Sequence, residues 1–529
     1  MSAFQPLVLV ADPIAEDGLA ILRQRARVET VTGNPEALER CLGQADALVV
    51  RSETRVTAAV LESAPRLRVI GRAGAGVDTI DVAAATERGI VVVNAPGGNA
   101  VAAAEHTLAL LFALVRRIPA ADASLKRGQW ARSEYVGTEL SGKTLGLIGL
   151  GRVGSEVARR ALALDMRVLV YDPYVPHEHA RRIGLQPIEL QALLEASDIV
   201  SLHVPLTEAT RGIVGAPQIA HMRPSAYILN CARAGLVDEA ALLAALGAGR
   251  LAGAAVDVFS SEPVRADDPL PRHAKVVATP HLGASTVEAQ ANVAVQIANE
   301  VLAVLEGRPA QFAVNAPSLP PEDVEALEPY LELVVMLGKL ATQLADAHLV
   351  SAEINYRGEI AQRNVGVLTA AAVQGLLEPI SDTTVNRVNA RLVAQQRGRE
   401  IVETRSSTSA HYTSLVGVTV NTRAGATSVA GVVSDGRANV VRIDDFELHL
   451  PATRGYVLVT RHVDQPGIIG LVGTLLGEAD INISSMQVGR KTPRGDALML
   501  LSVDEPVPTV VVERIRQAAN VAAIKVIKL

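Results

Sequence analysis

The sequence has few cysteines, few aromatic residues and no excess of basic residues. Two cysteines among 529 residues, Cys41 and Cys231, cannot build a disulfide framework or a cysteine-rich metal site, so we expect a reducing cytoplasm and no metal. Aromatic residues make up 3% of the chain, which argues against stacking on nucleobases as the main activity. The formal net charge of -6 lacks the basic excess that nucleic-acid binding requires, so we expect no nucleic-acid partner.

Long apolar runs are also missing. The longest, residues 101–115, contains Glu105 and His106 and is too short and too polar to span a bilayer, so we expect no membrane role. The N-terminus opens into a strand-like run at 7–10 without a basic leader segment. Hydrophobic residues nevertheless make up 49% of the chain, against 20% charged residues. This composition predicts packed globular cores, and the length suggests about three or four domains.

Strand-like and helical stretches alternate in two blocks, at residues 7–93 and 143–280. Such alternation predicts parallel sheets flanked by helices, and the second block suits a doubly wound fold. A long helix is expected over 285–305. The strand candidates of the second block are Thr144–Leu150, Arg167–Tyr171, Asp198–Val204, Ala226–Cys231, Leu251–Phe259 and Lys275–Thr279.

Prolines mark a boundary after this helix, because the stretch 308–322 favours extended backbone. Beyond it, residues 329–451 mix helices, expected at 330–347 and 385–397, with β-branched runs. This pattern indicates an α+β module without a chemical motif. From residue 455 the order is strand, helix, strand, strand, helix, strand, which is ferredoxin-like.

A glycine-rich turn carries the strongest chemical signal. It consists of Gly149, Leu150, Gly151, Arg152, Val153 and Gly154. The turn follows an apolar strand and opens a helix, as a dinucleotide pyrophosphate site requires. Asp172 ends the next strand about 20 residues on, where a carboxylate binds the adenosine ribose and repels a 2′-phosphate. The pattern predicts NAD rather than NADP. The alternative is a structural turn followed by an ordinary aspartate.

Three polar residues follow three successive strands of the same block: Arg233, Glu262 and His281. A guanidinium can clamp a carboxylate, and an imidazole paired with a carboxylate is a tunable general acid or base. Each also has a structural explanation: Arg233 could be a solvated loop cation, Glu262 an acid at the start of a helix, and His281 a turn residue that caps the next helix. Together, at the carboxyl ends of neighbouring strands, they favour catalysis.

These motifs together resemble the D-isomer-specific 2-hydroxyacid dehydrogenase family, over essentially the whole chain. Within it, residues 71–78 and 280–286 are similar to the long phosphoglycerate dehydrogenases. The resemblance implies a Rossmann-like nucleotide domain, a discontinuous flavodoxin-like substrate domain, an α+β intervening domain and a ferredoxin-like ACT domain. The implied ranges are 1–98 with 285–315 for substrate binding, 99–284 for NAD binding, 316–453 for the intervening domain and 454–529 for the ACT domain.

The resemblance also implies an activity: NAD-dependent oxidation of 3-phosphoglycerate to 3-phosphohydroxypyruvate, the first step of serine synthesis. One alternative is a dehydrogenase for another D-2-hydroxy acid or its oxo acid, such as glycerate or glyoxylate. A second is an NAD-sensing binding module that shares the fold. Turnover with and without the substrate phosphate separates the three.

Family roles carry over where the motifs match. Arg233 would bind the substrate carboxylate, His281 would exchange a proton with the C2 oxygen, and Glu262 would hold His281 and favour its protonated form. The cofactor cleft would further include Thr207, Cys231, Ala232, Asp257, Gly283 and Ala284. The substrate phosphate would be bound by Arg51, Ser52, Ala73, Gly74, Ala75, Gly76 and Asn99, with Arg72 and Arg132 as further candidates.

The C-terminal part resembles an ACT domain, a fold that typically binds amino acids between subunits. Asp464, Gly467 and Asn482 match the family's serine-contacting positions, and His462 aligns with a residue that varies in the family. The resemblance implies a serine effector and self-association into a homodimer or homotetramer. A second possibility is that Asp464 only caps the helix that follows.

Overall fold

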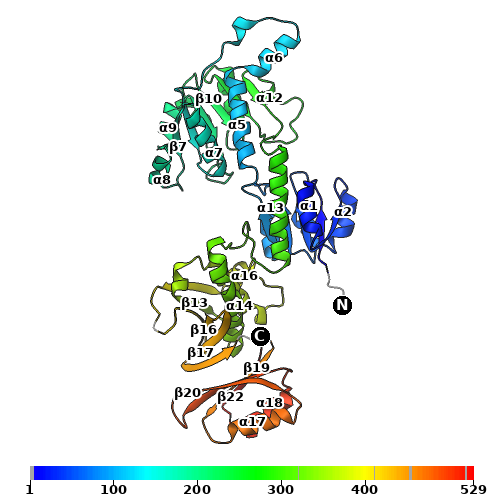
Figure 1. Cartoon of the computed structure of the whole chain (residues 1–529), viewed down its shortest axis with the longest axis vertical. Coiled ribbons are helices and arrows are strands. Elements are labelled where there is room, and N and C mark those ends of the chain that lie inside the picture. Colours follow the sequence, from blue (N-terminus) through cyan, green and yellow to red (C-terminus); the bar gives the residue numbers. More distant parts are fainter. Residues whose placement is uncertain (1–4, 320, 410, 452–454, 519–520) are drawn as a thin grey trace.

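The computed structural model describes residues 5–319, 321–409, 411–451, 455–518 and 521–529. These residues form four sheets with their helices, arranged along an elongated molecule (Figure 1). Within these ranges, no helix is long and apolar enough to cross a membrane.

The first sheet has five parallel strands in the order β2-β1-β3-β4-β5, which is flavodoxin-like. In β1, Leu7 and Leu9 enter one core while Val8 and Val10 enter the other, as expected for a strand buried on both faces. Helices α2, α3 and α4 cover one face, and α1 and α13 cover the other. The bounds are β1 Leu7–Val10, α1 Glu16–Arg23, β2 Arg27–Thr30, α2 Pro35–Leu42, β3 Ala47–Val50, α3 Ala58–Glu62, β4 Val69–Arg72, α4 Val82–Glu87, β5 Val91–Asn94 and α13 Val287–Leu305.

The second sheet has seven parallel strands in the order β12-β11-β10-β9-β6-β7-β8, a doubly wound arrangement. All the expected strands of this block are present: β7 has the expected bounds, the other five are shorter, and β8 is an additional strand. The bounds are α5 Ala100–Val115, α6 Ile118–Lys126, η1 Arg132–Tyr135, β6 Thr144–Ile148, α7 Arg152–Ala163, β7 Arg167–Tyr171, α8 His177–Arg182, β8 Gln186–Pro187, α9 Leu190–Ala196, β9 Ile199–Leu202, α10 Ala216–His221, β10 Tyr227–Asn230, α11 Glu239–Gly247, β11 Gly253–Val256, α12 Pro269–Arg272 and β12 Val276–Ala278.

The third sheet is mixed, in the order β14-β13-β15-β16-β17-β18, and α14 and α15 pack on it. The expected helix at 330–347 is α14, which begins earlier, at Pro321, because proline is well tolerated in the first turn of a helix. Of the expected helix at 385–397, only Ala390–Gln396 is α-helical, as α16. The bounds are α14 Pro321–Leu344, β13 Ser351–Gly358, η2 Glu359–Gln362, α15 Gly366–Leu377, η3 Glu378–Ile380, α16 Ala390–Gln396, β14 Glu400–Ser406, β15 Ser414–Thr422, β16 Gly425–Ser434, β17 Arg437–Ile443 and β18 Phe446–Pro451.

The fourth sheet is antiparallel, in the order β20-β21-β19-β22. Helices α17 and α18 cover one face. The opposite face points toward the third sheet (Figure 1), and Val457, Leu498 and Ile527 join the core formed around α14 and α15. The two parts therefore share one hydrophobic core. The bounds are β19 Tyr456–Val463, α17 Ile468–Gly477, β20 Ile483–Arg490, β21 Asp496–Val503, α18 Thr509–Ala518 and β22 Ala523–Lys528.

Polar contacts connect the third sheet's part to the first. Asn386 Nδ2 donates to the Gly89 carbonyl oxygen at 2.6 Å, and Arg387 Nη2 donates to the Gly307 carbonyl oxygen at 3.0 Å. This connection is polar, unlike the apolar one between the third and fourth sheets. The expected domain boundary at 453/454 lies outside the described residues.

Candidate active site

The glycine-rich turn follows β6 and leads into α7. Gly149 has a φ of +100°, and a Cβ there would lie 2.6 Å from the His203 carbonyl oxygen, so only glycine fits without strain. Gly151 is the N-cap of α7, with Arg152, Val153 and Gly154 in its first turn. The first N–H groups of a helix have no partner within it and attract anions. These residues therefore fit the pyrophosphate of a dinucleotide.

Asp172 is tied to this turn. Its Oδ2 accepts a hydrogen bond from the Leu150 N–H at 2.8 Å, and its Oδ1 accepts one from the Tyr174 N–H at 2.9 Å. The carboxylate thus stands at the end of β7, beside the turn, as a ribose contact requires. A cavity of about 120 Å³ adjoins it, lined by residues including Pro173, Val175 and Ile188. The Arg152 guanidinium lies over the Phe312 ring, 5.6 Å from its centroid.

Other predicted cofactor residues line the ends of β9 and β10. Thr207 is exposed, and its hydroxyl lies 3.0 Å from Thr210 Oγ1. Burial raises the pKa of the Cys231 thiol to about 12, so this thiol is neutral and is a poor nucleophile. The Ala232 N–H donates to Asn230 Oδ1 at 3.2 Å, which shapes the turn before Arg233.

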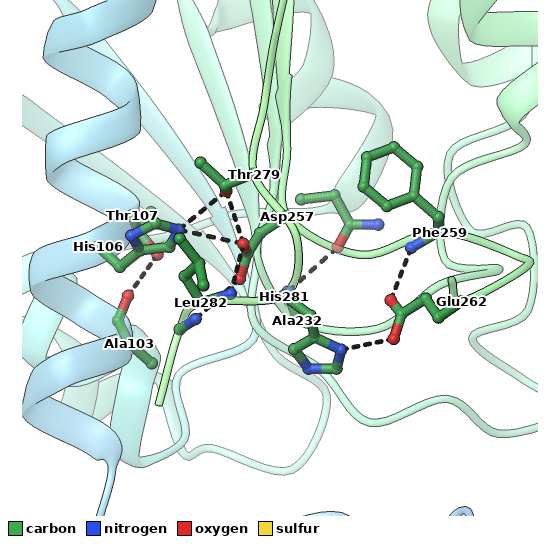
Figure 2. A network of polar contacts seen from close by, with 12 residues as sticks. Ala103, His106, Thr107, Ala232, Asp257, Phe259, Glu262, Thr279, His281 and Leu282 are labelled. Carbon is green, nitrogen blue, oxygen red and sulfur yellow. Dashed lines mark hydrogen bonds and ion pairs between the residues drawn. The ribbon is translucent and has the colours of Figure 1, made fainter. Parts of the chain in front are cut away.

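His281 and Glu262 point toward each other across adjacent loops (Figure 2). His281 Nδ1 lies 2.8 Å from Glu262 Oε2, and Glu262 Oε1 accepts from the Phe259 N–H at 3.0 Å. The glutamate is thereby held by its own loop while it orients the imidazole. This pair can exchange a proton with a bound substrate.

Asp257 is buried at the end of β11, beneath the loop that follows His281. Its carboxylate accepts from the N–H groups of Leu282 at 2.8 Å and Gly283 at 2.9 Å. Burial favours a higher pKa for Asp257, but hydrogen bonds from His106 and Thr279 outweigh it, so the pKa lies below its ordinary value. Asp257 was expected in the cofactor cleft. In the structure its carboxylate is engaged inside the protein and orders the 282–283 backbone, with Ala284 next in the chain.

Arginines from both sheets meet where the two sheets face each other. Arg233, after β10, places its Nε 3.2 Å from Oδ2 of Asp78, which follows β4. Gly76 makes this approach possible, because a Cβ there would lie 2.2 Å from Arg233 Nη2. Burial and, next, the charge of Arg233 lower the pKa of Arg72 to about 10. Arg72 Nε is buried without a hydrogen-bond partner among the described residues.

Asp12, which the sequence analysis missed, organises the loop around Arg51 and Ser52. Its carboxylate accepts from the Arg51 N–H at 2.5 Å and from Thr54 Oγ1 at 2.5 Å. Arg51 also contributes to the lowered pKa of Arg72, after the larger effects of burial and Arg233. In the sequence, Asp12 is a single aspartate that follows a strand. No pattern there shows that its side chain binds the neighbouring loop rather than water.

The loop at 73–76 lies on the same side. The Gly74 carbonyl oxygen accepts from the Ala95 N–H at 2.9 Å, and the Ala75 carbonyl oxygen accepts from Asn94 Nδ2 at 2.6 Å. Ala73 is buried, and Asn99 is the N-cap of α5. Arg132 is different: it is exposed in η1, which follows α6, and α6 projects from the end of the molecule that is distant from the first sheet (Figure 1). A single chain does not bring Arg132 to the other arginines.

The predicted effector residues occupy opposite ends of the fourth sheet. Asp464 Oδ2 pairs with Arg490 Nη1 at 2.9 Å, whereas Asn482 Nδ2 donates to Asp504 Oδ2 at 2.7 Å. Strand β21 fixes their separation, because Arg490 pairs with Ala497 and Ile483 pairs with Val503, roughly 20 Å apart along the strand. His462 is buried, which lowers its pKa, and Gly467 is the N-cap of α17 with a φ of +95°. One chain therefore groups His462, Asp464 and Gly467 at one end of the sheet but does not bring Asn482 to them.

Known proteins share this organisation. The D-isomer specific 2-hydroxyacid dehydrogenase NAD binding domain matches residues 108–283, the D-3-phosphoglycerate dehydrogenase intervening domain matches 326–444, and the ACT domain matches 456–520. The solved D-lactate dehydrogenase from Aquifex aeolicus, complexed with NAD and lactic acid, is 30% identical, with a TM-score of 0.54 over 59% of this chain and 100% of its own.

Full-length relatives are more similar. D-3-phosphoglycerate dehydrogenase from Synechocystis sp. is 43% identical over 99% of this chain and 94% of its own length. The enzyme of that name from Bacillus subtilis is 42% identical over 99% of both chains. The chain therefore belongs to the D-isomer-specific 2-hydroxyacid dehydrogenases and, within them, to the D-3-phosphoglycerate dehydrogenase family. The predicted fold class, NAD cofactor and dehydrogenase activity are confirmed.

Proposed function

We propose that this protein oxidises 3-phosphoglycerate to 3-phosphohydroxypyruvate with NAD, the first step of serine synthesis. The observation that carries this proposal is the cationic cluster formed by Arg51, Arg72 and Arg233. Burial and neighbouring positive charge lower the pKa of Arg72 to about 10, and the carboxylates of Asp78 and Asp12 offset this only in part, so the cluster favours additional negative charge. A substrate with both a carboxylate and a phosphate supplies it.

Different residues of the chain bind the substrate, transfer the proton and bind the cofactor. Arg233 binds the substrate carboxylate, and Arg51 and Arg72 bind the phosphate together with backbone N–H groups of the 73–76 loop. His281 accepts the proton of the C2 hydroxyl, and Glu262 stabilises the imidazolium that forms. NAD, when bound, would supply the hydride acceptor for C2. Asp172 binds the adenosine ribose and disfavours the 2′-phosphate of NADP.

We propose the domain limits 1–98 with 285–315, 99–284, 316–453 and 454–529. The packing of α13 on the first sheet supports a discontinuous substrate-binding domain. Asn315 supports its C-terminal limit, because its side chain accepts from the Val92 N–H at 2.8 Å. Two free cysteines favour a reducing compartment such as the cytoplasm.

We also propose a homodimer or homotetramer. Apolar side chains on and after α6 are exposed, and a second copy would cover them. They are Ile118, Leu125, Trp130 and Val136, with exposed fractions of 51%, 58%, 85% and 79%. Arg132 lies among these residues, so in a dimer it would contact the substrate that is bound to the other subunit.

We further propose serine as the effector, bound between two ACT domains. Asp464 and Asn482 lie at opposite ends of one sheet, so two sheets side by side could bring Asp464 of one copy to Asn482 of the other. Both side chains now have internal partners, Arg490 and Asp504. Serine would therefore have to compete with these contacts.

Reduction of 3-phosphohydroxypyruvate, followed at the NADH absorbance, tests the function. We expect turnover with this substrate and a much higher KM for hydroxypyruvate. Arg72→Ala should raise KM for the phosphorylated substrate far more than for hydroxypyruvate, because a buried phosphate dianion requires charged partners. Arg27→Ala, which removes an exposed guanidinium paired with Glu29, is the control. Equal effects of Arg72→Ala on both substrates would contradict the proposed phosphate site.

A further inference from the structure

His106 lies on α5 and faces the loop that carries His281 (Figure 2). Its Nε2 is 3.1 Å from Thr279 Oγ1 and 3.1 Å from Asp257 Oδ1. The side chain is only 18% exposed, so these contacts are shielded from water. In the sequence, His106 is only a polar interruption of an apolar run.

The directions of the neighbouring hydrogen bonds show whether Nε2 of His106 is a donor or an acceptor. The Thr279 hydroxyl donates to Asp257 Oδ1 at 2.6 Å, so its oxygen is free to accept. Asp257 is an ionised carboxylate and can only accept. Nε2 of His106 must therefore carry a hydrogen and donate to these oxygens. An imidazole with a hydrogen on Nε2 meets this requirement.

Asp257 restrains the chain on both sides of His281. It accepts from Thr279 before His281 and from the N–H groups of Leu282 and Gly283 after it. His281 itself has a φ of +56°, which a non-glycine residue adopts only when its surroundings enforce it. The Asp257 carboxylate provides this enforcement, and its hydrogen bonds set where the imidazole of His281 lies.

His106 reaches this carboxylate from a different element. Helix α5 begins directly after Asn99, where the chain passes from the first sheet to the second, whereas Thr279, Leu282 and Gly283 belong to the loop itself. Without the His106 donor, the buried Asp257–Thr279 pair would lose a hydrogen-bond partner, which is unfavourable for buried polar groups. The loop could relax to recover it, and His281 would move.

We propose that His106 is a positioning residue for proton transfer, which acts as a hydrogen-bond donor that fixes Asp257 and Thr279 and through them the backbone of His281. The inference rests on the proposed function for the role of His281. It assigns to His106 no contact with substrate or cofactor.

Two substitutions distinguish the effect of losing the hydrogen-bond donor from the effect of changing the size of the side chain. His106→Leu removes the donor, and His106→Gln keeps an N–H donor at a similar distance from the backbone. Glu105→Gln is the control on the same helix, since Glu105 pairs with Arg160 outside the network. For each variant, kcat and KM are measured with 3-phosphohydroxypyruvate, and the NADH Kd is measured by calorimetry.

We expect kcat of His106→Leu to fall about tenfold to a hundredfold, the cost of a small misplacement of a reacting group. KM and the NADH Kd should stay within about twofold, and His106→Gln should recover most of the loss, as a donor role requires. Unchanged kcat in His106→Leu, or a loss in His106→Gln as large as in His106→Leu, would overturn the inference. So would a parallel loss of NADH affinity in His106→Leu.

The wild-type protein is assayed first, also with hydroxypyruvate and glyoxylate. If only an unphosphorylated substrate is reduced, the proposed function fails, but the variants compared on that substrate still test His106. The ring signals of His281 in nuclear magnetic resonance spectra provide a measurement that needs no turnover. They should shift in His106→Leu and remain near the wild-type positions in His106→Gln and Glu105→Gln. An unshifted His281 signal in His106→Leu would overturn the inference.

Discussion

At the scale of single residues, His281 and Glu262 have separable roles. His281→Ala removes the group that exchanges the proton, and general acid–base catalysis contributes about 100- to 10,000-fold, so we expect kcat to fall by that order. NADH affinity should remain nearly intact. Steady-state kinetics and calorimetry measure the two quantities, and near-wild-type turnover would exclude His281 as the proton-transfer group.

Glu262→Gln is the companion variant. Glutamine can still accept from the Phe259 N–H, so the loop keeps its anchor, but the negative charge beside the imidazole is lost. That charge favours imidazolium, the form that donates a proton during reduction of the oxo acid. We therefore expect the pH optimum for reduction to move to lower pH. A pH profile identical to that of the wild type would contradict the pairing.

Asp172 supports a second prediction at this scale. Asp172→Asn keeps an acceptor for the Leu150 N–H but removes the charge that repels a 2′-phosphate. We expect the ratio of kcat/KM for NADH to kcat/KM for NADPH to decrease, mainly because kcat/KM for NADPH rises. Asp165→Asn, on a loop beyond α7, is a charge-matched control. If the wild type uses both cofactors equally well, Asp172 does not contact the ribose.

At the scale of elements, the 73–76 loop controls where Arg233 lies. Gly76→Ala places a methyl group where Arg233 Nη2 now lies, and because the guanidinium is flexible it will shift rather than unfold the loop. We expect KM for the substrate to rise about tenfold, the equivalent of 1.4 kcal/mol of binding, with little change in Tm. Gly247→Ala, in α11 with open space around the new methyl group, is the control. Unchanged KM would show that Arg233 tolerates displacement.

Elements with a clear pattern were predictable from the sequence, and others were not. The apolar strands β1, β3 and β4 and the glycine-rich turn have strong local signals. Strand β2 was missed because it is an edge strand with a mostly polar, partly exposed sequence. Helix α15 was missed because it is buried on nearly all sides and has no polar face to reveal its period.

The site shows the same division. Motif residues such as Glu262 and His281 could be located because their order along the chain places them at one sheet edge. Asp12, Asp78 and His106 could not, because their importance depends on which distant residue they meet. Arg72 was named only as a further candidate, since burial and the nearby charge of Arg233 are tertiary properties.

At the scale of the whole molecule, the shared core determines where the chain can be cut. A variant ending at Pro317 removes both C-terminal parts and breaks mainly polar contacts such as Asn386 to Gly89. We expect it to remain active and to lose any response to serine, because solved relatives matching 58–61% of this chain use 97–100% of their own length. An inactive, folded variant would show that the C-terminal parts are needed for catalysis.

A variant ending before Gly455 is the informative comparison. It uncovers the apolar residues of the third sheet that pack against Val457, Leu498 and Ile527, so we expect a lower Tm or self-association. Assays with and without millimolar serine distinguish loss of regulation from loss of stability. If this shorter cut leaves Tm and solubility unchanged, the shared core contributes little to stability.

The core common to the third and fourth sheets also has a consequence for folding. Units that bury their apolar surface against each other gain stability together, so neither can open alone without exposing the other. We therefore expect the part of the chain that contains the third and fourth sheets to unfold as one cooperative unit rather than as two modules. A change that loosens the ACT domain then also affects the packing of α14, and this helix follows the segment that connects to the first two sheets.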